Sequence, residues 1–147
     1  MKVSDILAAK GGTKGGDVIG IEPAASLEAA AKLLSKHRIG AVIIRGAGGR
    51  LAGILSERDI VRALAEGGAA ALGQPVSRVM TKDVLYAQPG ETVDSLLTRM
   101  TDRRIRHLPV CQNERLVGIV SIGDLVKSKI SEVEAEADGL KAYIAAS

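Results

Sequence analysis

Two short segments of the chain combine residue types that could hold a sugar phosphate. Residues 56–59 (Ser-Glu-Arg-Asp) and 121–124 (Ser-Ile-Gly-Asp) share the pattern Ser-x-x-Asp, and each directly follows an apolar run. A serine hydroxyl together with the free amides at the start of a helix suits a phosphate, because the positive end of the helix dipole attracts anions. A carboxylate at the same point can accept hydrogen bonds from both hydroxyls of a ribose. The two segments therefore indicate two related nucleotide sites.

The same pattern also has a purely structural interpretation. In a capping box, the serine accepts a hydrogen bond from a first-turn amide, and the acid three residues later accepts one from the serine amide. An isolated Ser-x-x-Asp favours this interpretation. Its occurrence at the same point of two similar segments favours a ligand site, and the sequence alone leaves both interpretations open.

The elements that must position these residues occur twice. Residues 21–28 and 87–94 align at an offset of 66 residues, and after the turns that follow the offset becomes 65. In each copy, apolar residues spaced i, i+3, i+4, i+7 predict an amphipathic helix. These residues are Leu27, Ala30, Ala31 and Leu34 in the first copy and Val93, Leu96, Leu97 and Met100 in the second.

Short apolar runs predict the strands of each copy. Runs 41–44 and 108–110 come after the two helices, and runs 51–56 and 116–121 come after the turns. Each pair of runs predicts a hairpin, and a second helix then closes the copy. With a short run ahead of the first helix, the order is strand, helix, strand, strand, helix.

We therefore predict an α/β (α+β) fold made of two βαββα repeats. Repeat 1 with its N-terminal lead spans 1–70, repeat 2 spans 71–130, and an amphipathic C-terminal helix spans 131–147. A unit of this size cannot bury one apolar sheet face alone, so the repeats should pack around a pseudo-two-fold axis and leave two related clefts. The apolar residues near the C-terminus are spaced three and four apart, which suits packing on the same domain or on a partner helix. They are Ile130, Val133, Ala137, Leu140 and Ile144.

The composition disfavours several classes of protein. Of 147 residues, 46% are apolar and 25% are charged, which is typical of a globular domain. Apolar runs fall far short of the ~20 residues of a membrane span, and the N-terminus lacks the features of a signal peptide, so we expect a cytoplasmic protein without a membrane partner. A net charge of +3 and an aromatic content of 1% disfavour nucleic acid as a partner.

Taken together, segments 39–41, 53–59, 106–110 and 118–124 resemble a tandem pair of CBS motifs, the module named after cystathionine beta-synthase and also called a Bateman module. The resemblance covers residues 3–129. It implies an adenosine ligand, such as AMP, ADP, ATP or NAD(H), bound between the motifs. It also implies nucleotide-binding roles for Ser56, Arg58, Asp59, Ser121, Asp124, Arg106, His107, Lys14 and Thr81.

The implied roles follow residue type. By the resemblance, the two aspartates would hold ribose, the two serines would lie near ribose or phosphate, and Arg106 with His107 would reach phosphate. Residues 14–17 and 81–83, which include Lys14 and Thr81, enter the first strand of each copy and would border the base or the phosphates. The first copy has Gly40-Ala41 where the second has Arg106-His107, so the two clefts should differ in affinity or in ligand.

These features predict an adenosine-nucleotide sensor that signals through a conformational or dimer-interface change, and the resemblance implies a homodimer. The alternative is a ligand-free interaction module that regulates a separate enzyme or transporter. The basic residues at 99–107 leave nucleic-acid binding as a further hypothesis, although the negative end of a helix already accounts for Arg99 and Arg103.

Catalysis is not expected from this sequence. The glycine-rich segment 11–16 lacks the spacing of a P-loop, His37 has no nearby metal-ligating residue, and Cys111 has no neighbouring base. We expect no catalytic residues, no catalytic cofactor and no metal site.

Overall fold

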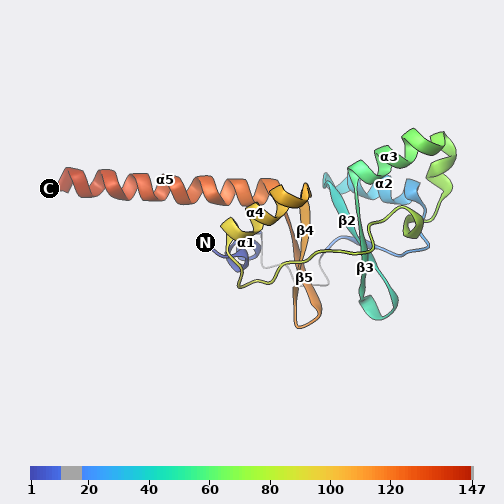
Figure 1. The fold of residues 1–147 in the computed structure, drawn as a ribbon, viewed down its shortest axis with the longest axis horizontal. Helices are drawn as coiled ribbons and strands as arrows, with labels where there is room; N and C mark the ends of the chain where they lie inside the picture. The colour runs from blue at the N-terminus through green and yellow to red at the C-terminus, as the bar shows by residue number, and fades with distance from the viewer. Residues whose placement is uncertain (11–17, 147) are drawn as a thin grey trace.

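The computed structural model describes residues 1–10 and 18–146, which form two α+β units side by side (Figure 1). The first unit contains β1 (Gly20–Ile21), α2 (Leu27–His37), β2 (Ala41–Arg45), β3 (Leu51–Ser56) and α3 (Glu57–Gly67). Its sheet has the order β1-β2-β3, with β1 parallel to β2 and β2 antiparallel to β3. The predicted α+β class and the βαββα order of the first repeat are confirmed.

The second unit contains α4 (Val93–Arg103), β4 (His107–Gln112), β5 (Arg115–Ser121) and α5 (Ile122–Ala146). The first strand expected here is reduced to a single parallel bridge between Ala87 and Val110, which corrects the prediction for this copy. In the first unit the Ile43 amide donates to the Ile19 carbonyl and extends β1. The residue at the offset of 66 is Pro109, which has no amide hydrogen, so the equivalent bond cannot form.

Each unit is completed by a lead segment that the sequence places ahead of the other unit. The helix α1 (Val3–Ala9) inserts Val3, Ile6 and Leu7 into the core of the second unit, beside α4, β4 and β5. The turn Val76–Arg78 places Val76 in the core of the first unit. The two leads are thus exchanged between the repeats.

Equivalent backbone hydrogen bonds hold the exchanged leads. The Val93 amide donates to the Met1 carbonyl at 3.0 Å, and the Leu27 amide donates to the Gln74 carbonyl at 2.9 Å. Both bonds fall at the first residue of the amphipathic helix, α4 or α2, so the lead also fixes where that helix begins.

The predicted closing helix of the second repeat and the predicted C-terminal helix form one continuous helix, α5. Leu125 is buried, and Ser128, Lys129 and Glu132 are half-buried against the body of the protein. From residue 133 to residue 146 the side chains are exposed, and α5 projects beyond α1 and α4 (Figure 1). Within residues 1–10 and 18–146, no helix is both long and apolar enough to cross a membrane.

Close backbone approaches at two glycines bring each lead against the opposite hairpin. A Cβ atom on Gly53 would lie 2.6 Å from the Met80 sulfur and 2.8 Å from the Thr81 carbonyl oxygen. The Ile54 amide and the Thr81 carbonyl are 3.1 Å apart, and the reciprocal bond is 2.9 Å. The equivalent glycine of the second unit, Gly118, lies against the end of the Leu7 side chain. At position 53 the neighbour is backbone, so only glycine leaves room for that crossing.

Gly53→Ala should lower the free energy of unfolding by about 1–3 kcal/mol, because the added methyl group meets a hydrogen-bonded carbonyl that cannot move freely. Urea denaturation of the two proteins measures the difference. Gly73→Ala is the matched control, since a Cβ there meets nothing within 4 Å, and it should change stability by less than about 0.5 kcal/mol. Equal effects of the two substitutions would contradict the steric argument.

Candidate functional site

Two cavities lie where the two units meet. The Asp124 cleft, of about 380 Å³, is lined by Lys10, Val18, Ile19, residues 38–41, His107, Ile119, Ser121 and Asp124. The Asp59 cleft, of about 320 Å³, is lined by Gly40, Ile54, residues 56–59, Arg62, Thr81, residues 83–85 and residues 104–107. Both units contribute to each cleft, so a ligand in either one would contact both repeats.

The two clefts are built from equivalent parts of the fold. Each lies at the first turn of a closing helix, α3 or α5. The first amide of that helix donates a hydrogen bond to the carbonyl of the residue just before β2 or β4 of the same unit. The Glu57 amide donates to the Gly40 carbonyl at 2.9 Å, and the Ile122 amide donates to the Arg106 carbonyl at 2.8 Å. These bonds fix the direction of α3 and α5, and with it the direction of their positive ends.

Each Ser-x-x-Asp segment forms a capping pair and lines a cleft at the same time. The Ser56 amide donates to Asp59 Oδ2 at 2.9 Å, and the Asp59 amide donates to the Ser56 hydroxyl at 3.3 Å. In the second unit the corresponding distances are 2.9 Å and 3.1 Å for Ser121 and Asp124. A carboxylate has about four lone-pair positions, so the capping bond leaves acceptor capacity for a ligand. The two interpretations of the pattern are therefore compatible.

In the Asp124 cleft, Lys10 forms an ion pair with the Asp124 carboxylate. Its ammonium group is 2.9 Å from Asp124 Oδ2 and 3.0 Å from the Ile119 carbonyl oxygen. Burial acts to raise the pKa of Asp124, but the hydrogen bond from the Ser121 amide and the bond and charge of Lys10 outweigh it, so the pKa lies below its usual value. Lys10 was not predicted from the sequence, because it ends the lead ahead of the first repeat and yet lies beside Asp124 of the second repeat.

An arginine at the end of the amphipathic helix enters each cleft. Arg38 follows α2 and Arg104 follows α4, with φ values of 52° and 54° in the left-handed region. Each helix ends in a Schellman motif, in which the Ile39 amide bonds to Leu34 and the Ile105 amide bonds to Met100. Glycine is the usual residue at this position. A repeated arginine there, at the offset of 66, is a signal that the sequence analysis passed over.

The model of the CBS domain family matches residues 3–66 and 76–131. The chain belongs to the CBS domain family. It is 32% identical to the CBS domain-containing protein CBSX3, mitochondrial, of Arabidopsis thaliana, over 97% of this chain and 71% of that protein. The tandem CBS pair inferred from the motifs is thereby confirmed.

Solved structures of CBS-domain proteins share the fold. The CBS-domain containing protein ATU1752 from Agrobacterium tumefaciens is 47% identical and has a TM-score of 0.82, with 87% of this chain and 92% of that chain covered. The CBS domain pair of protein MJ0100, crystallised in complex with 5'-methylthioadenosine and S-adenosyl-L-methionine, is 30% identical. It has a TM-score of 0.77 and covers 90% of this chain and 98% of that chain.

His107 lies at the contact between the two CBS motifs and borders both clefts. A Cβ atom on Gly40 would lie 2.8 Å from the His107 ring, so glycine at position 40 makes this contact possible. Burial lowers the pKa of His107, although the carboxylates of Glu57 and Asp124 act in the opposite direction. The imidazole is therefore mainly neutral at neutral pH, and it offers a ligand a hydrogen bond rather than a positive charge.

The structure places most of the predicted site residues in the two clefts of the CBS pair. The Asp59 cleft is lined by Ser56, Arg58, Asp59, Thr81, Arg106 and His107. The Asp124 cleft is lined by Ser121, Asp124 and His107. Lys14 lies outside the described residues. Asp83, which the resemblance implied with Thr81, also lines the Asp59 cleft, whereas Lys10, Arg38, Arg62 and Leu85 were not predicted as cleft residues.

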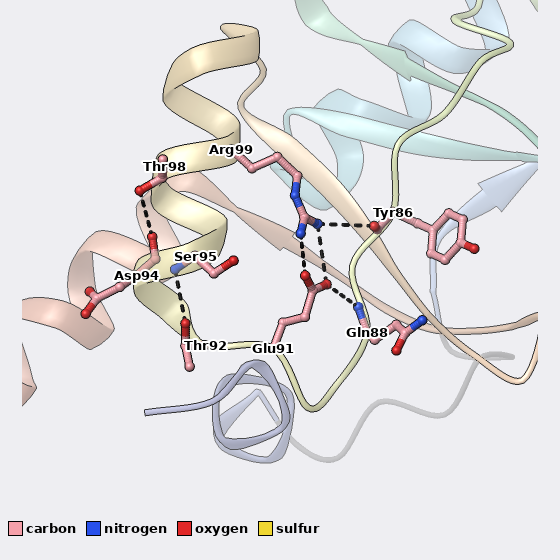
Figure 2. Close-up of polar contacts among 8 residues, drawn as sticks. All are labelled: Tyr86, Gln88, Glu91, Thr92, Asp94, Ser95, Thr98 and Arg99. Carbon is pink, nitrogen blue, oxygen red and sulfur yellow. Dashed lines mark hydrogen bonds and ion pairs between the residues drawn. The ribbon is translucent and has the colours of Figure 1, made fainter.

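Arg99 is held in an ion pair with Glu91, whereas the sequence predicted a solvated position suited to the negative end of the helix. Figure 2 shows its guanidinium group reaching the Glu91 carboxylate and the Tyr86 carbonyl oxygen, which is 3.4 Å away. Glu91 also accepts a hydrogen bond of 2.8 Å from the Gln88 amide. The bond to Arg99 is the main cause of a lowered pKa at Glu91. This contact ties the segment before α4 to the helix itself.

Lys10→Met should raise the pKa of Asp124, because the substitution removes one hydrogen bond and the nearby positive charge. Carboxyl titration followed by NMR measures this pKa. A lowered folded-state pKa contributes stability above the ordinary carboxyl pKa, and that contribution is lost as the pH falls through the folded-state pKa. The variant should therefore lose part of this contribution, by less than about 1 kcal/mol for such a partly exposed pair.

Lys32→Met is the matched control for this titration. Lys32 pairs with Glu28 at 3.7 Å on the exposed face of α2, away from both clefts. Its removal should leave the Asp124 titration unchanged. An Asp124 pKa that is the same in wild type and in Lys10→Met would show that Lys10 does not act on this carboxylate in solution.

Proposed function

We propose that this CBS pair is a regulatory sensor that binds an adenosine nucleotide, such as AMP, ADP, ATP or NAD(H), and changes the arrangement of its two motifs on binding. The observation that carries the proposal is that each cleft combines a capping Ser-Asp pair at a helix start with residues of the other motif. The complex of the MJ0100 CBS pair with two adenosine compounds supports the ligand class.

The Asp59 cleft suits a phosphorylated ligand. Asp59 accepts its capping bonds at Oδ2, which leaves Oδ1, 3.7 Å from the Arg62 guanidinium, to accept from ribose hydroxyls. Four arginines line this cleft, and a guanidinium matches phosphate oxygens with two parallel bonds. They are Arg58, Arg62, Arg104 and Arg106. The carboxylates of Glu57 and Asp83 offset part of this charge, so phosphate should lie toward the arginines.

The apolar part of the same cleft suits a base. It is lined by Ile54 of the first hairpin, by Val84 and Leu85 of the segment between the two motifs, and by Ile105 just before β4. Thr81, fixed by its backbone bonds to Ile54, borders this part of the cavity. A nucleoside would thus contact both repeats along its length.

The Asp124 cleft should bind ligand more weakly. Ribose hydroxyls would share or displace the bond from Lys10 to Asp124, and this exchange lowers the net gain from binding. A phosphate close to Lys10 and Arg38 would recover part of that gain. The expectation that the two clefts differ is retained here as a proposal.

Signalling follows from the position of the clefts between the repeats. A ligand shifts a conformational equilibrium only by its different affinity for the two states, which is typically worth ~1–3 kcal/mol of coupling. The contact of His107 with Gly40 separates the two clefts, so binding in either one acts on the same junction.

The alternative is a ligand-free module that regulates a separate enzyme or transporter. The observation that favours it is that both Ser-Asp pairs already form complete caps, one of them closed further by Lys10. Calorimetry with AMP, ADP, ATP, NADH, 5'-methylthioadenosine and S-adenosyl-L-methionine separates the two functions. Heat and a thermal shift with any of them support the sensor, and their absence with all six supports the alternative.

Asp59→Asn and Asp124→Asn should each weaken binding in the cleft concerned by roughly tenfold or more, because a charge-assisted hydrogen bond worth ~1.5–3 kcal/mol is lost. Calorimetry measures both affinities. Asp5→Asn is the matched control, since Asp5 accepts the Lys2 amide at 2.9 Å at the start of α1, outside both clefts. Unchanged affinity in both cleft variants would reduce the two aspartates to helix caps.

Arg104→Gly should raise the stability of the protein and weaken its binding of ATP. Glycine relieves the left-handed backbone at φ 54°, which should raise the free energy of unfolding by about 1 kcal/mol. The same variant should bind ATP roughly tenfold more weakly, since a phosphate contact is lost. Arg104→Lys keeps the charge and the backbone conformation, and should keep wild-type stability. Wild-type ATP affinity in Arg104→Gly would remove Arg104 from the site.

A further inference from the structure

The exposed part of α5 carries a continuous apolar seam that faces away from the body of the protein. The residues of the seam are spaced alternately four and three positions apart: Val126, Ile130, Val133, Ala137 and Leu140. Ile130, Val133 and Leu140 are 53%, 50% and 61% exposed. This spacing is the a and d pattern of a coiled coil, with Ile130 and Ala137 at a and Val126, Val133 and Leu140 at d.

The seam is distinct from the face of α5 that packs on its own chain. Leu125, Ser128, Lys129 and Glu132 form the inner face, with the spacing i, i+3, i+4, i+7. At about 100° per residue, the centre of the seam is rotated by roughly 100° from the centre of this inner face. A second helix can therefore lie along the seam while the inner contacts stay in place.

The outer half of α5 gains little from packing on its own chain. Residues 133–146 are exposed, and most helical stability in proteins comes from packing of an amphipathic face. Gly139 lies inside this segment and costs about 1 kcal/mol relative to alanine. Burial of the seam would supply the missing stabilisation.

The charges beside the seam identify the partner as a second copy of the same helix in parallel orientation. In a parallel pair, each g position faces the e position five residues later on the partner. Lys129 would then face Glu134, and Glu136 would face Lys141, so both contacts are attractive. Lys129 also lies 3.1 Å from Asp94 of its own chain, which makes the pair of Glu136 and Lys141 the better probe.

An antiparallel pair is disfavoured by the same residues. With Ile130 facing Leu140, Glu134 would face Glu134 of the partner and Lys127 would face Lys141, so like charges meet on one side. On the other side Glu136 would face its own copy. We propose that two copies of this chain associate through a parallel two-stranded coiled coil formed by α5.

Light scattering of the full chain at about 50 µM tests the association. The wild type should be a dimer, and Leu140→Glu should raise the dimer dissociation constant by about 100-fold or more, because it places two charges in the apolar seam. Ala135→Glu, an exposed residue on the outer side of α5, is the matched control and should stay dimeric. A monomeric wild type, or a Leu140→Glu variant as dimeric as the control, would overturn the proposal.

Orientation is tested by reversing one charge. Lys141→Glu should weaken a parallel dimer by roughly fivefold, because each of two attractive contacts becomes repulsive, and the double variant Glu136→Lys/Lys141→Glu should restore it. In an antiparallel dimer Lys141→Glu would face Lys127 and strengthen association. A tighter dimer for the single variant would therefore overturn the parallel arrangement.

Oxidative cross-linking gives a second measure of orientation. In a background of Cys111→Ala, Leu140→Cys should form a disulfide with its own copy, since equivalent d positions meet in a parallel pair. In the antiparallel register these positions would be about 15 Å apart, beyond the reach of a disulfide. Monomeric protein after oxidation would contradict the proposed geometry.

Discussion

Burial of each hydrophobic core by the lead segment that precedes the other repeat is the constraint on which the rest of the structure depends. The helix α1 closes the core of the second CBS motif, and the turn at Val76 closes the core of the first. The chain that leaves the turn at Val76 must then cross toward the second motif. The crossing at Gly53 and Thr81 is a direct result, and it places Thr81 and the residues after it against the first hairpin, where they form a wall of the Asp59 cleft.

The same arrangement explains why capping residues stand in the clefts. The closing helices begin where the two motifs meet, so their first turns combine a serine and a carboxylate with side chains of the opposite motif. Helix formation and a potential ligand site use the same atoms. Differences between the clefts then arise from single positions, such as Lys10 beside Asp124 and the arginines beside Asp59.

Local patterns in the sequence predicted most of the elements, and most of the site residues predicted from it line the two clefts. Helical spacing in residues 27–34 and 93–100 fixed α2 and α4, and the Ser-x-x-Asp segments marked the first turns of α3 and α5. The exchange of the leads was not predictable in this way, because it depends on contacts between distant residues. Lys10 was missed for that reason, whereas the loss of a strand at Pro109 follows from a missing amide and could have been recognised.

Exchange of the leads also has a consequence for how the gene for such a protein can be divided. A break in the chain near residue 70 leaves one fragment with the α1 segment that fits the second motif, and another fragment with the Val76 segment that fits the first. Neither fragment contains a complete hydrophobic interior. The two pieces would be mutually dependent for folding and would have to reassemble by complementation. The exchanged leads thus make the two motifs one folding unit rather than two autonomous modules.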